Sequence, residues 1–569
     1  MRPTGEAEAS PPERPPWGAL VTLSAGVSLI IIDATIVNVA LPTIIADLDL
    51  TLTQAEWINS VYALVFASLL ILFGRLGDAL GRKRVFVAGI AFFVGASLLA
   101  ALAPTGGWLI FARVIQGIGG AAVLPSSLSL VNTTFRGPAR AVAFGAWGAT
   151  IGGMAALGPL AGGLLTEYAG WRWIFLVNLP LGAIIVIAAL RVVPESRDPA
   201  PVRSWDIPGV LLLSLGLGLL VFGLIEAQTY GWLRPEAPFV IGGWEWPLGS
   251  VSPVAGAFGL SVVALGLFWG VERRAIQPLV DFELFRVRSF SAGNFAALIV
   301  ALGEFGLVFT IPLFLQSVLG LTALEAGAAL AVTALGALVA GGAAARLSQT
   351  IGPRAVARWG LGLEVVGLAL YALLVGPAIS AWRLVPALFI YGLGVGLATA
   401  QLTSVILADI PRERSGQASG IQSTSRQIGS ALGIAILGAT LAAGLAAQSE
   451  QRLLAVGVPP VQAARIAKAV ESSGGTAIPG LSAKLPPAAT EALREAGAAA
   501  TRRTGLVAAG SSCSACSRRS SSRTSGTKTS DGGDWRWQPA ATLVAAARRQ
   551  QCRGQGSGLR SGCSRHGHG

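Results

Sequence analysis

The sequence is poor in charge, cysteine and histidine. Charged residues make up 12% of the 569 residues and apolar residues 53%, whereas a soluble protein of this length needs far more charge to cover its surface. All four cysteines and both histidines follow residue 510. There is no glycine loop followed by Lys and Ser/Thr that would cradle a phosphate. A soluble enzyme, an ATP-driven machine and a metal site before residue 510 are therefore not expected.

Long apolar runs dominate the sequence instead. A bilayer-spanning helix needs roughly 20 mostly apolar residues, and many of the runs are rich in Gly and Ala, as closely packed membrane helices are. Thirteen such runs cover about 18–45, 55–73, 85–103, 108–131, 141–165, 173–190, 207–225, 251–271, 290–319, 326–345, 359–378, 383–408 and 418–446. The pattern predicts an all-α polytopic protein embedded in a lipid bilayer.

The basic residues behind the net charge of +13 set the orientation of the chain in the membrane and do not indicate a nucleic-acid partner. With a cytoplasmic N-terminus, the inward loops carry arginine clusters such as those at 75–84, 273–288 and 346–358. The outward loops before the end of the thirteenth run carry Arg172, Arg234 and Arg383 only. This asymmetry follows the positive-inside rule. It predicts a multi-pass protein of the cytoplasmic membrane.

An internal repeat divides the chain. The segment Gly74–Lys83 recurs as 345–354, with Arg75 matching Arg346 and Gly81 matching Gly352. Transporters built from repeats bind substrate between the repeats and rock one against the other. The expected division is a disordered tail at 1–16, a six-helix bundle at 17–190, two linker helices at 191–289, a second bundle with five identified helices at 290–446, an extracytoplasmic segment at 447–510 and a disordered tail at 511–569.

Polar residues inside the runs of the first half are candidates for proton coupling. A carboxylate in hydrocarbon is costly, and desolvation favours its protonated form, so Asp33 suits a proton carrier. The alternative is that Asp33 lies in a water-filled vestibule or caps a helix break. Asn38 is more than one turn away and is expected to bond an adjacent helix. Arg113 is deep in the fourth run and needs backbone carbonyls, Gln116 or a carboxylate as partners.

The second half offers two further carboxyl groups. Glu304 lies in the middle of the ninth run and is the next candidate for protonation or for pairing a cationic substrate. Glu364 lies nearer the cytoplasmic end of the eleventh run and is ranked third, because it can simply reach water. Aromatic residues such as Phe309 and Tyr391 either line a pocket for flat cations or belong to the core.

Two glycine-containing segments have conformational rather than chemical roles. In the loop after the second run, Gly74 and Gly77 let helix ends approach closely, and Asp78 either caps a following helix or pairs with Arg82 next to Lys83. The same loop contains Gly81. This loop is interpreted as a charged latch that holds one conformer, or else as a solvated loop that sets topology. In the fifth run, the segment at 158–163 (Gly158, Pro159, Gly162 and Gly163) bends the helix and permits close packing.

Five segments, in the right order, resemble motifs of the Major Facilitator Superfamily and of its fourteen-helix drug:proton antiporter family. They are Asp33–Pro42, Gly74–Arg84, Arg113–Gly119, Gly158–Gly163 and Trp171–Pro180. The likeness runs from about residue 17 to about 447. The resemblance implies two six-helix bundles with two extra central helices and a role for Arg113 in proton coupling. The motif at 158–163 implies export rather than import.

The leading interpretation is a proton-driven antiporter that exports small, amphipathic or cationic compounds. It would need no cofactor and act as a monomer, with protons and a small-molecule substrate as its partners. A second interpretation is a dedicated exporter of one self-made metabolite. A third, from another class, is a membrane sensor without a transport cycle.

The C-terminal region departs from the family, because no fourteenth apolar run follows residue 446. A zinc site made of Cys513, Cys516, His566 and His568 is disfavoured, since no packed scaffold surrounds these residues. A shifted reading frame explains more features of this region than a zinc site does. One back-translation of residues 510–517, read from its third base, gives Leu-Leu-Leu-Leu-Ser-Leu-Leu, which would begin a membrane helix. The sequence therefore predicts a lost last helix and a functionally irrelevant tail from about residue 511.

Overall fold

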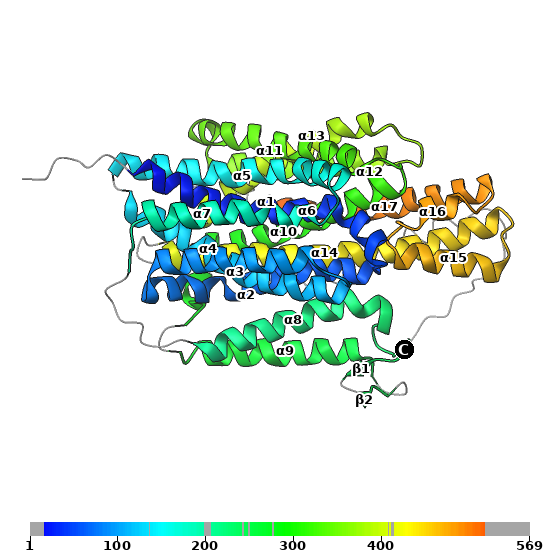
Figure 1. The fold of residues 1–569 in the computed structure, drawn as a ribbon, viewed down its shortest axis with the longest axis horizontal. Coiled ribbons are helices and arrows are strands. Elements are labelled where there is room, and N and C mark those ends of the chain that lie inside the picture. The colour runs from blue at the N-terminus through cyan, green and yellow to red at the C-terminus, as the bar shows by residue number, and fades with distance from the viewer. Residues whose placement is uncertain are drawn as a thin grey trace, which may run out of the picture. The chain divides into compact units, whose positions relative to one another are not determined.

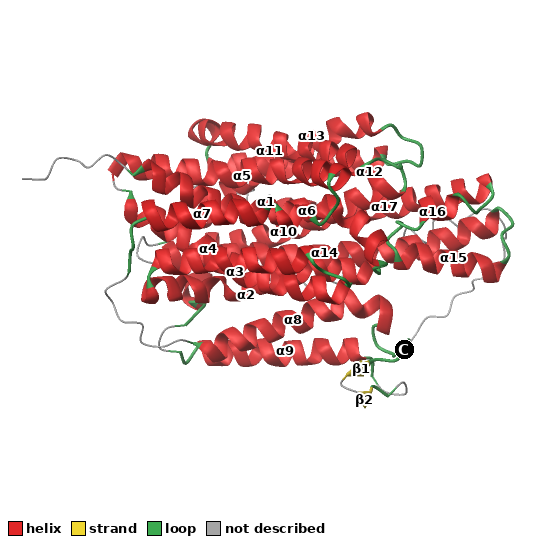
Figure 2. Ribbon diagram, in the orientation of Figure 1, coloured by secondary structure: helices red, strands yellow, loops and turns green. Residues whose placement is uncertain are grey.

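The computed structural model describes residues 16–135, 137–197, 206–241, 244–247, 251–275, 278–407, 409–410 and 415–517. These residues are almost entirely helical, as Figure 2 shows. Most of the expected N-terminal tail and the chain from residue 518 lie outside the described residues.

The N-terminal half contains seven helices, two of which share the sixth apolar run. They are α1 (Trp17–Leu48), α2 (Leu52–Leu80), α3 (Arg82–Ala101), α4 (Gly106–Thr134), α5 (Gly137–Tyr168), α6 (Trp173–Leu176) and α7 (Asn178–Val192). Within this half α1 packs against α5, and α4 packs between α2 and α3.

A helical hairpin lies between the two halves in the sequence. In the structure it packs beside α2 and α14 at one side of the bundle (Figure 1). It consists of α8 (Ile207–Tyr230) and α9 (Pro253–Glu272), joined through the short antiparallel strands β1 (Val240–Ile241) and β2 (Trp244–Glu245). These are the two additional helices that the sequence predicts between the repeats. Trp57 of α2 donates a hydrogen bond from Nε1 to Glu226 of α8 over 2.9 Å, so the hairpin is fastened to the N-terminal half.

The C-terminal half begins with the short 3-10 helix η1 (Phe282–Arg286). The helices that follow are α10 (Arg288–Ser317), α11 (Ala323–Ile351), α12 (Pro353–Leu374), α13 (Ala381–Leu407), α14 (Ser415–Ala455), α15 (Pro460–Ser472), α16 (Ile478–Ser482) and α17 (Pro487–Ser517). With 41 residues, α14 is roughly 60 Å long, about twice the hydrocarbon thickness of a bilayer. Figure 1 shows α15 and α16 beyond one end of the other helices, here called the α15 end.

The internal repeat is visible in the helix caps. Thr51 begins α2 and Thr322 begins α11, and each forms a capping box with the residue three positions later. The two helices end at Gly81 and Gly352, whose φ angles of 115° and 83° favour glycine. Both pairs are 271 residues apart (322 − 51 and 352 − 81), the offset of the repeated loop.

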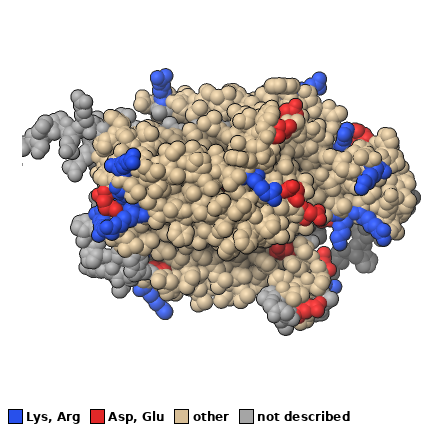
Figure 3. All heavy atoms as spheres, in the orientation of Figure 1, with Lys and Arg blue, Asp and Glu red and all other residues tan. Residues whose placement is uncertain are grey.

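Twelve helices in the described part of the chain are long and apolar enough to cross a membrane, as judged by length and composition. They correspond to twelve of the thirteen expected runs, and the remaining run, 141–165, lies within α5. Large apolar side chains such as Ile184, Leu211 and Val262 are more than half exposed. In the view of Figure 3, charged side chains are mostly toward the two ends, and a broad belt nearly free of Lys, Arg, Asp and Glu lies between them. The protein is a multi-pass membrane protein.

Helix α17 corrects the expectation that no helix follows the thirteenth run. It packs against α10, α12 and α14, and Arg502 donates a hydrogen bond to the carbonyl of Val375 at the end of α12 over 2.9 Å. Its helical backbone reaches Ser517, so the boundary predicted at residue 511 is too early. The composition of α17 hides it from a search for apolar runs, because its first half carries charges such as Glu491 and Arg494.

Candidate functional site

Asp33 and Arg113 form an ion pair in the interior of the N-terminal half. Asp33 of α1 is fully buried, Arg113 of α4 is 1% exposed, and Asp33 Oδ2 lies 2.5 Å from Arg113 Nη1. Gln116, one turn along α4, accepts from Arg113 Nη1 at 2.8 Å and donates to Asp33 Oδ1 at 3.2 Å. The structure therefore brings together three residues that the sequence analysis singled out.

Three further residues complete this network, and the sequence analysis did not select them. Asn178 of α7 donates to Asp33 Oδ1 over 3.0 Å, and Ser97 of α3 accepts from both Gln116 and Asn178. The guanidinium of Arg113 lies 4.2 Å from the ring centre of Tyr62 on α2. The network joins five helices around one carboxylate, which provides the partners that a buried charge requires.

Asn38 lies outside this network, as expected from its spacing. Its side-chain oxygen accepts a hydrogen bond from Asn59 of α2 at 3.3 Å, and its amide donates to the carbonyl of Ala34. Asn38 thus joins α1 to α2 rather than contacting Asp33.

A second polar cluster lies in the C-terminal half. Arg426 of α14 pairs with Glu304 of α10 at 3.2 Å and donates to Thr399 of α13 over 3.2 Å. The side chains of Glu304 and Arg426 are 20% and 25% exposed, so this pair is more accessible than the pair in the N-terminal half. The sequence analysis missed Arg426, although an arginine inside an apolar run is a visible signal.

Glu364 and Tyr391 belong to the same cluster. Glu364 is 1% exposed, which contradicts the interpretation that it reaches water. Its Oε1 atom and the hydroxyl of Tyr391 are buried and have no hydrogen-bond partner among the described residues. The charges of Glu304 and Arg426 both act on Glu364. The cluster therefore contains two carboxyl groups, one guanidinium and an unsatisfied phenol.

The segment Gly74–Arg84, which was expected to be a loop, is helical in α2 and α3 apart from Gly81, and it contains the ion pair that was predicted for it. Asp78 lies 2.7 Å from Arg82 Nη2, and Arg82 Nη1 donates to Ser196 Oγ over 2.9 Å. Lys83 donates from its backbone to Glu195 and from Nζ to the carbonyl of Leu190. These contacts fasten the segment to the end of α7 and to the residues that follow it. The alternative that Asp78 caps a helix is wrong, because Gly81 is the cap of α3 and no side chain caps it.

The glycine motif of α5 allows two helices to approach its backbone. A Cβ atom added at Gly162 would lie 2.7 Å from the carbonyl oxygen of Ile36 on α1, and one added at Gly163 would lie 2.6 Å from that of Ala323 at the start of α11. Gly158 faces Thr35 of α1, while Pro159 is buried beside Gly327 of α11. We call the contact of Gly163 and Pro159 with α11 the glycine seam, and it joins the two halves.

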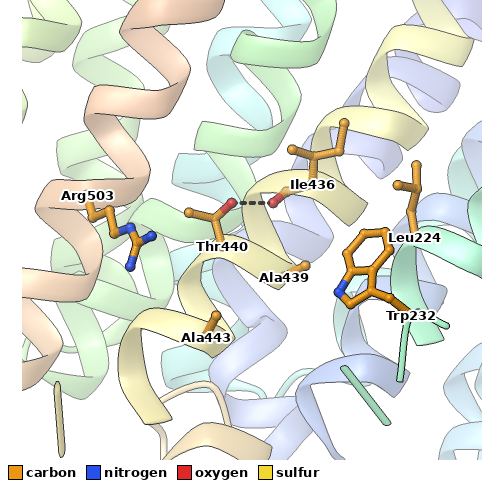
Figure 4. Close-up of a pocket in the computed structure, with 7 residues that line it drawn as sticks. All are labelled: Leu224, Trp232, Ile436, Ala439, Thr440, Ala443 and Arg503. Atoms are coloured by element: carbon orange, nitrogen blue, oxygen red, sulfur yellow. Dashed lines mark hydrogen bonds between the residues drawn. The ribbon is translucent and has the colours of Figure 1, made fainter. Parts of the chain in front are cut away.

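A cavity of about 250 Å³ lies elsewhere, between α8, α14 and α17. Figure 4 shows Arg503 of α17 on one side and Leu224 and Trp232 on the other, with Thr440 of α14 between them. None of the predicted coupling residues lines it. Because it lies between the linker hairpin and the last helix, we do not regard it as the central substrate site.

No group of three or more His, Cys, Asp or Glu side chains suited to hold a metal was found in the portion of the chain that the structure describes. The zinc ligands considered for the tail lie outside the residues whose side chains are described.

Comparison with known proteins places this geometry in context. The sequence pattern of the Major Facilitator Superfamily matches residues 23–434. The chain is 36% identical to the probable actinorhodin transporter of Streptomyces coelicolor (78% of this chain, 75% of that protein) and 36% identical to the puromycin resistance protein pur8 of Streptomyces alboniger (76% and 84%). It is 34% identical to the multidrug efflux pump LfrA of Mycolicibacterium smegmatis (85% and 91%).

Among solved structures, a bacterial homologue of the human lysosomal transporter Spinster, in an inward-facing and unoccupied conformation, superposes with a TM-score of 0.57 at 21% identity. The match covers 91% of this chain and all of that one. At this identity the likeness concerns the fold.

Proposed function

The chain belongs to the Major Facilitator Superfamily, and from this premise we propose that it is a proton-coupled antiporter. It exports small amphipathic or cationic compounds across the cytoplasmic membrane, acts as a monomer and has its N-terminus in the cytoplasm. The observation that carries the proposal is the fully buried Asp33 with its bond to Arg113. It is a transporter and not an enzyme, and its relatives include proteins of drug resistance and efflux.

The network around Asp33 supports proton coupling because its bonds depend on charge. As an ion, Asp33 accepts from Arg113, Gln116 and Asn178. When it binds a proton it loses the attraction to Arg113, whose guanidinium then keeps only its neutral partners. Since the network spans five helices, including α1 itself, a change of protonation alters contacts that hold these helices together. This is the local event that a rocking cycle needs.

The cluster around Glu304 supports a cationic or amphipathic substrate. Glu304 and Glu364 provide two carboxyl groups against the single guanidinium of Arg426, and Tyr391 adds an aromatic face. A positively charged compound can replace Arg426 as the partner of Glu304, which is partly exposed. The position of this cluster in the other repeat, on α10, α12, α13 and α14, fits substrate binding between the halves.

The second candidate is a dedicated exporter of one self-made metabolite. It is favoured by the similarity to the probable actinorhodin transporter. The sensor interpretation has no support, because the family consists of transporters.

Transport by inverted membrane vesicles tests the proposal. Vesicles with the protein should accumulate cationic dyes only when a proton gradient is imposed, and Asp33→Asn should abolish this. Asp49→Asn is the matched control: Asp49 is exposed after the end of α1, with a φ of 51° that Asn tolerates. Gradient-independent uptake would contradict proton coupling, and uptake of one compound among many would favour the dedicated exporter.

A further inference from the structure

Glu56 is a buried carboxyl group that the network around Asp33 does not use. It lies one turn into α2 near the α15 end and is 3% exposed. It faces Gly438 of α14, where an added Cβ atom would lie 2.6 Å from the carboxyl carbon of Glu56. No hydrogen bond or ion pair to its carboxyl group occurs among the residues that the structure describes.

Among the described residues, no cation compensates the charge of Glu56. No charged residue occurs at 57–74 of α2, 427–449 of α14 or 207–225 of α8. The charge that acts on Glu56 is that of Glu226 on α8, which has the same sign and bonds Trp57.

The charged groups on the other neighbouring helices are paired with other residues, exposed, or located at the cavity between α8, α14 and α17. On α4, Arg113 is bound to Asp33. On α15, which touches α2, Arg465 and Lys468 are exposed and Glu471 is half-buried. On α17, Arg503 lines the cavity of Figure 4. Gly438 faces largely away from that cavity, because it is about 140–160° around α14 from Ile436, Thr440 and Ala443 and about 100° from Ala439.

Burying an ionised carboxylate without a partner costs several kcal/mol. Glu56 is therefore neutral as long as α2 and α14 remain in contact around it. These two helices belong to opposite halves of the molecule, and the halves also meet at this end where Gln316 of α10 donates to the carbonyl of Val39 on α1 over 2.8 Å. If the α15 end opens, α2 and α14 separate and water reaches Glu56.

We propose that Glu56 is a second proton-binding residue of the transport cycle and that it controls closure of the α15 end. Glu56 ionises when that end is open to water. It must bind a proton from the water on that side, forming an O–H bond on its carboxylate, before α2 can pack against Gly438 again. The proposal rests on the proposed function and adds a place where an external proton is required. Gly438 is the positioning residue, since its missing side chain lets the carboxyl group of Glu56 pack directly against α14.

The distance between spin labels across the α15 end tests the proposal. The label sites are Tyr168 at the end of α5 and Leu454 at the end of α14, which are 76% and 42% exposed, and Cys513, Cys516, Cys552 and Cys563 are replaced by Ser. The purified full chain is studied in liposomes without substrate between about pH 5 and about pH 9, the range that buried carboxyl groups reach. In the parent, the fraction with the long distance should rise with pH.

Three variants separate the possible causes. Glu56→Gln should keep the short distance at every pH, whereas Glu491→Gln, which changes an exposed carboxyl group at the same end, should keep the parent's response. Gly438→Ala should favour the long distance at every pH, and adding Glu56→Ala should reverse this. A parent without a pH response, an unchanged response in Glu56→Gln or an unchanged distance in Gly438→Ala would each overturn the proposal. If efflux stays gradient-dependent while the distance between the labels does not respond to pH, the role of Glu56 is refuted and the proposed function is not.

Discussion

Replacing Asp33 with Asn removes the negative charge from a site where Arg113 is 1% exposed. Removing one partner of a buried ion pair costs about 3–5 kcal/mol, because the other charge is left uncompensated. Arg113 would keep its bonds to the carbonyl of Ile58 at 3.2 Å and to Gln116 at 2.8 Å, together with the ring of Tyr62. We therefore expect a loss near the lower limit, about 3 kcal/mol.

The functional effect should exceed the effect on stability. Asn has nearly the shape of Asp, but its amide does not bind and release a proton near neutral pH. Proton-coupled efflux should therefore be lost while the protein still inserts into the membrane. Unfolding of the purified protein measures the first effect, and dye transport by inverted vesicles with and without a proton gradient measures the second. The amount of protein in the membrane is compared in both cases.

The double variant Asp33→Asn/Arg113→Gln separates the two roles of the pair. Replacing both partners of a buried pair is often neutral for stability, so most of the lost stability should return, while coupled efflux should remain absent. Gradient-driven efflux in either variant would refute the proton-carrier role of Asp33. Failure of the double variant to recover stability would refute the view that an unpaired Arg113 causes the loss.

Three other predictions concern the loop, the second cluster and the end of the chain. Asp78→Ala frees Arg82 from its 2.7 Å partner and should slow turnover while dye-binding affinity stays the same, because a latch affects conformers and not ligands; weaker binding at an unchanged cycling rate would contradict this. Glu304→Gln leaves Arg426 without its carboxylate and should reduce efflux of cationic substrates more than that of neutral ones; equal losses in the same vesicle assay would assign Glu304 to structure or proton coupling instead. Finally, resequencing the DNA near codon 510 should reveal an apolar continuation of about 20 residues in another frame, and a confirmed frame without one would reject the idea of a frameshift.

Most ionisable members of the site could be predicted from the sequence because charge inside an apolar run is rare and costly; Arg426 gives the same signal and was missed. Asp33, Arg113 and Glu304 stand out for this reason, and the pairing of Asp78 with Arg82 follows from their spacing on one turn. Asn178 and Ser97 could not be selected in this way. Uncharged polar residues are common in membrane helices, and the bond from Asn178 to Asp33 spans 145 positions of the chain.

The end of the fold was harder to predict for a different reason. The search for membrane helices relies on continuous apolar runs, whereas the first half of α17 lies beyond the apolar belt with α15 and α16 and is charged. Its helix is held by contacts with α14 and α12, including the pair of Arg452 with Glu495. Such tertiary contacts leave no periodic signal in the sequence.

The glycine seam limits which substitutions the protein can tolerate during evolution. At Gly163 and Gly327, backbone meets backbone across the two halves, so almost any substitution there adds atoms where none fit. The cluster around Glu304, Thr399 and Arg426, in contrast, consists of side chains that can be exchanged without moving a helix. Under the proposed function, substitutions can therefore alter the substrate range while the contact between the two halves at the seam stays fixed. We expect new resistance profiles to arise from exchanges around the second cluster and hardly ever from the seam.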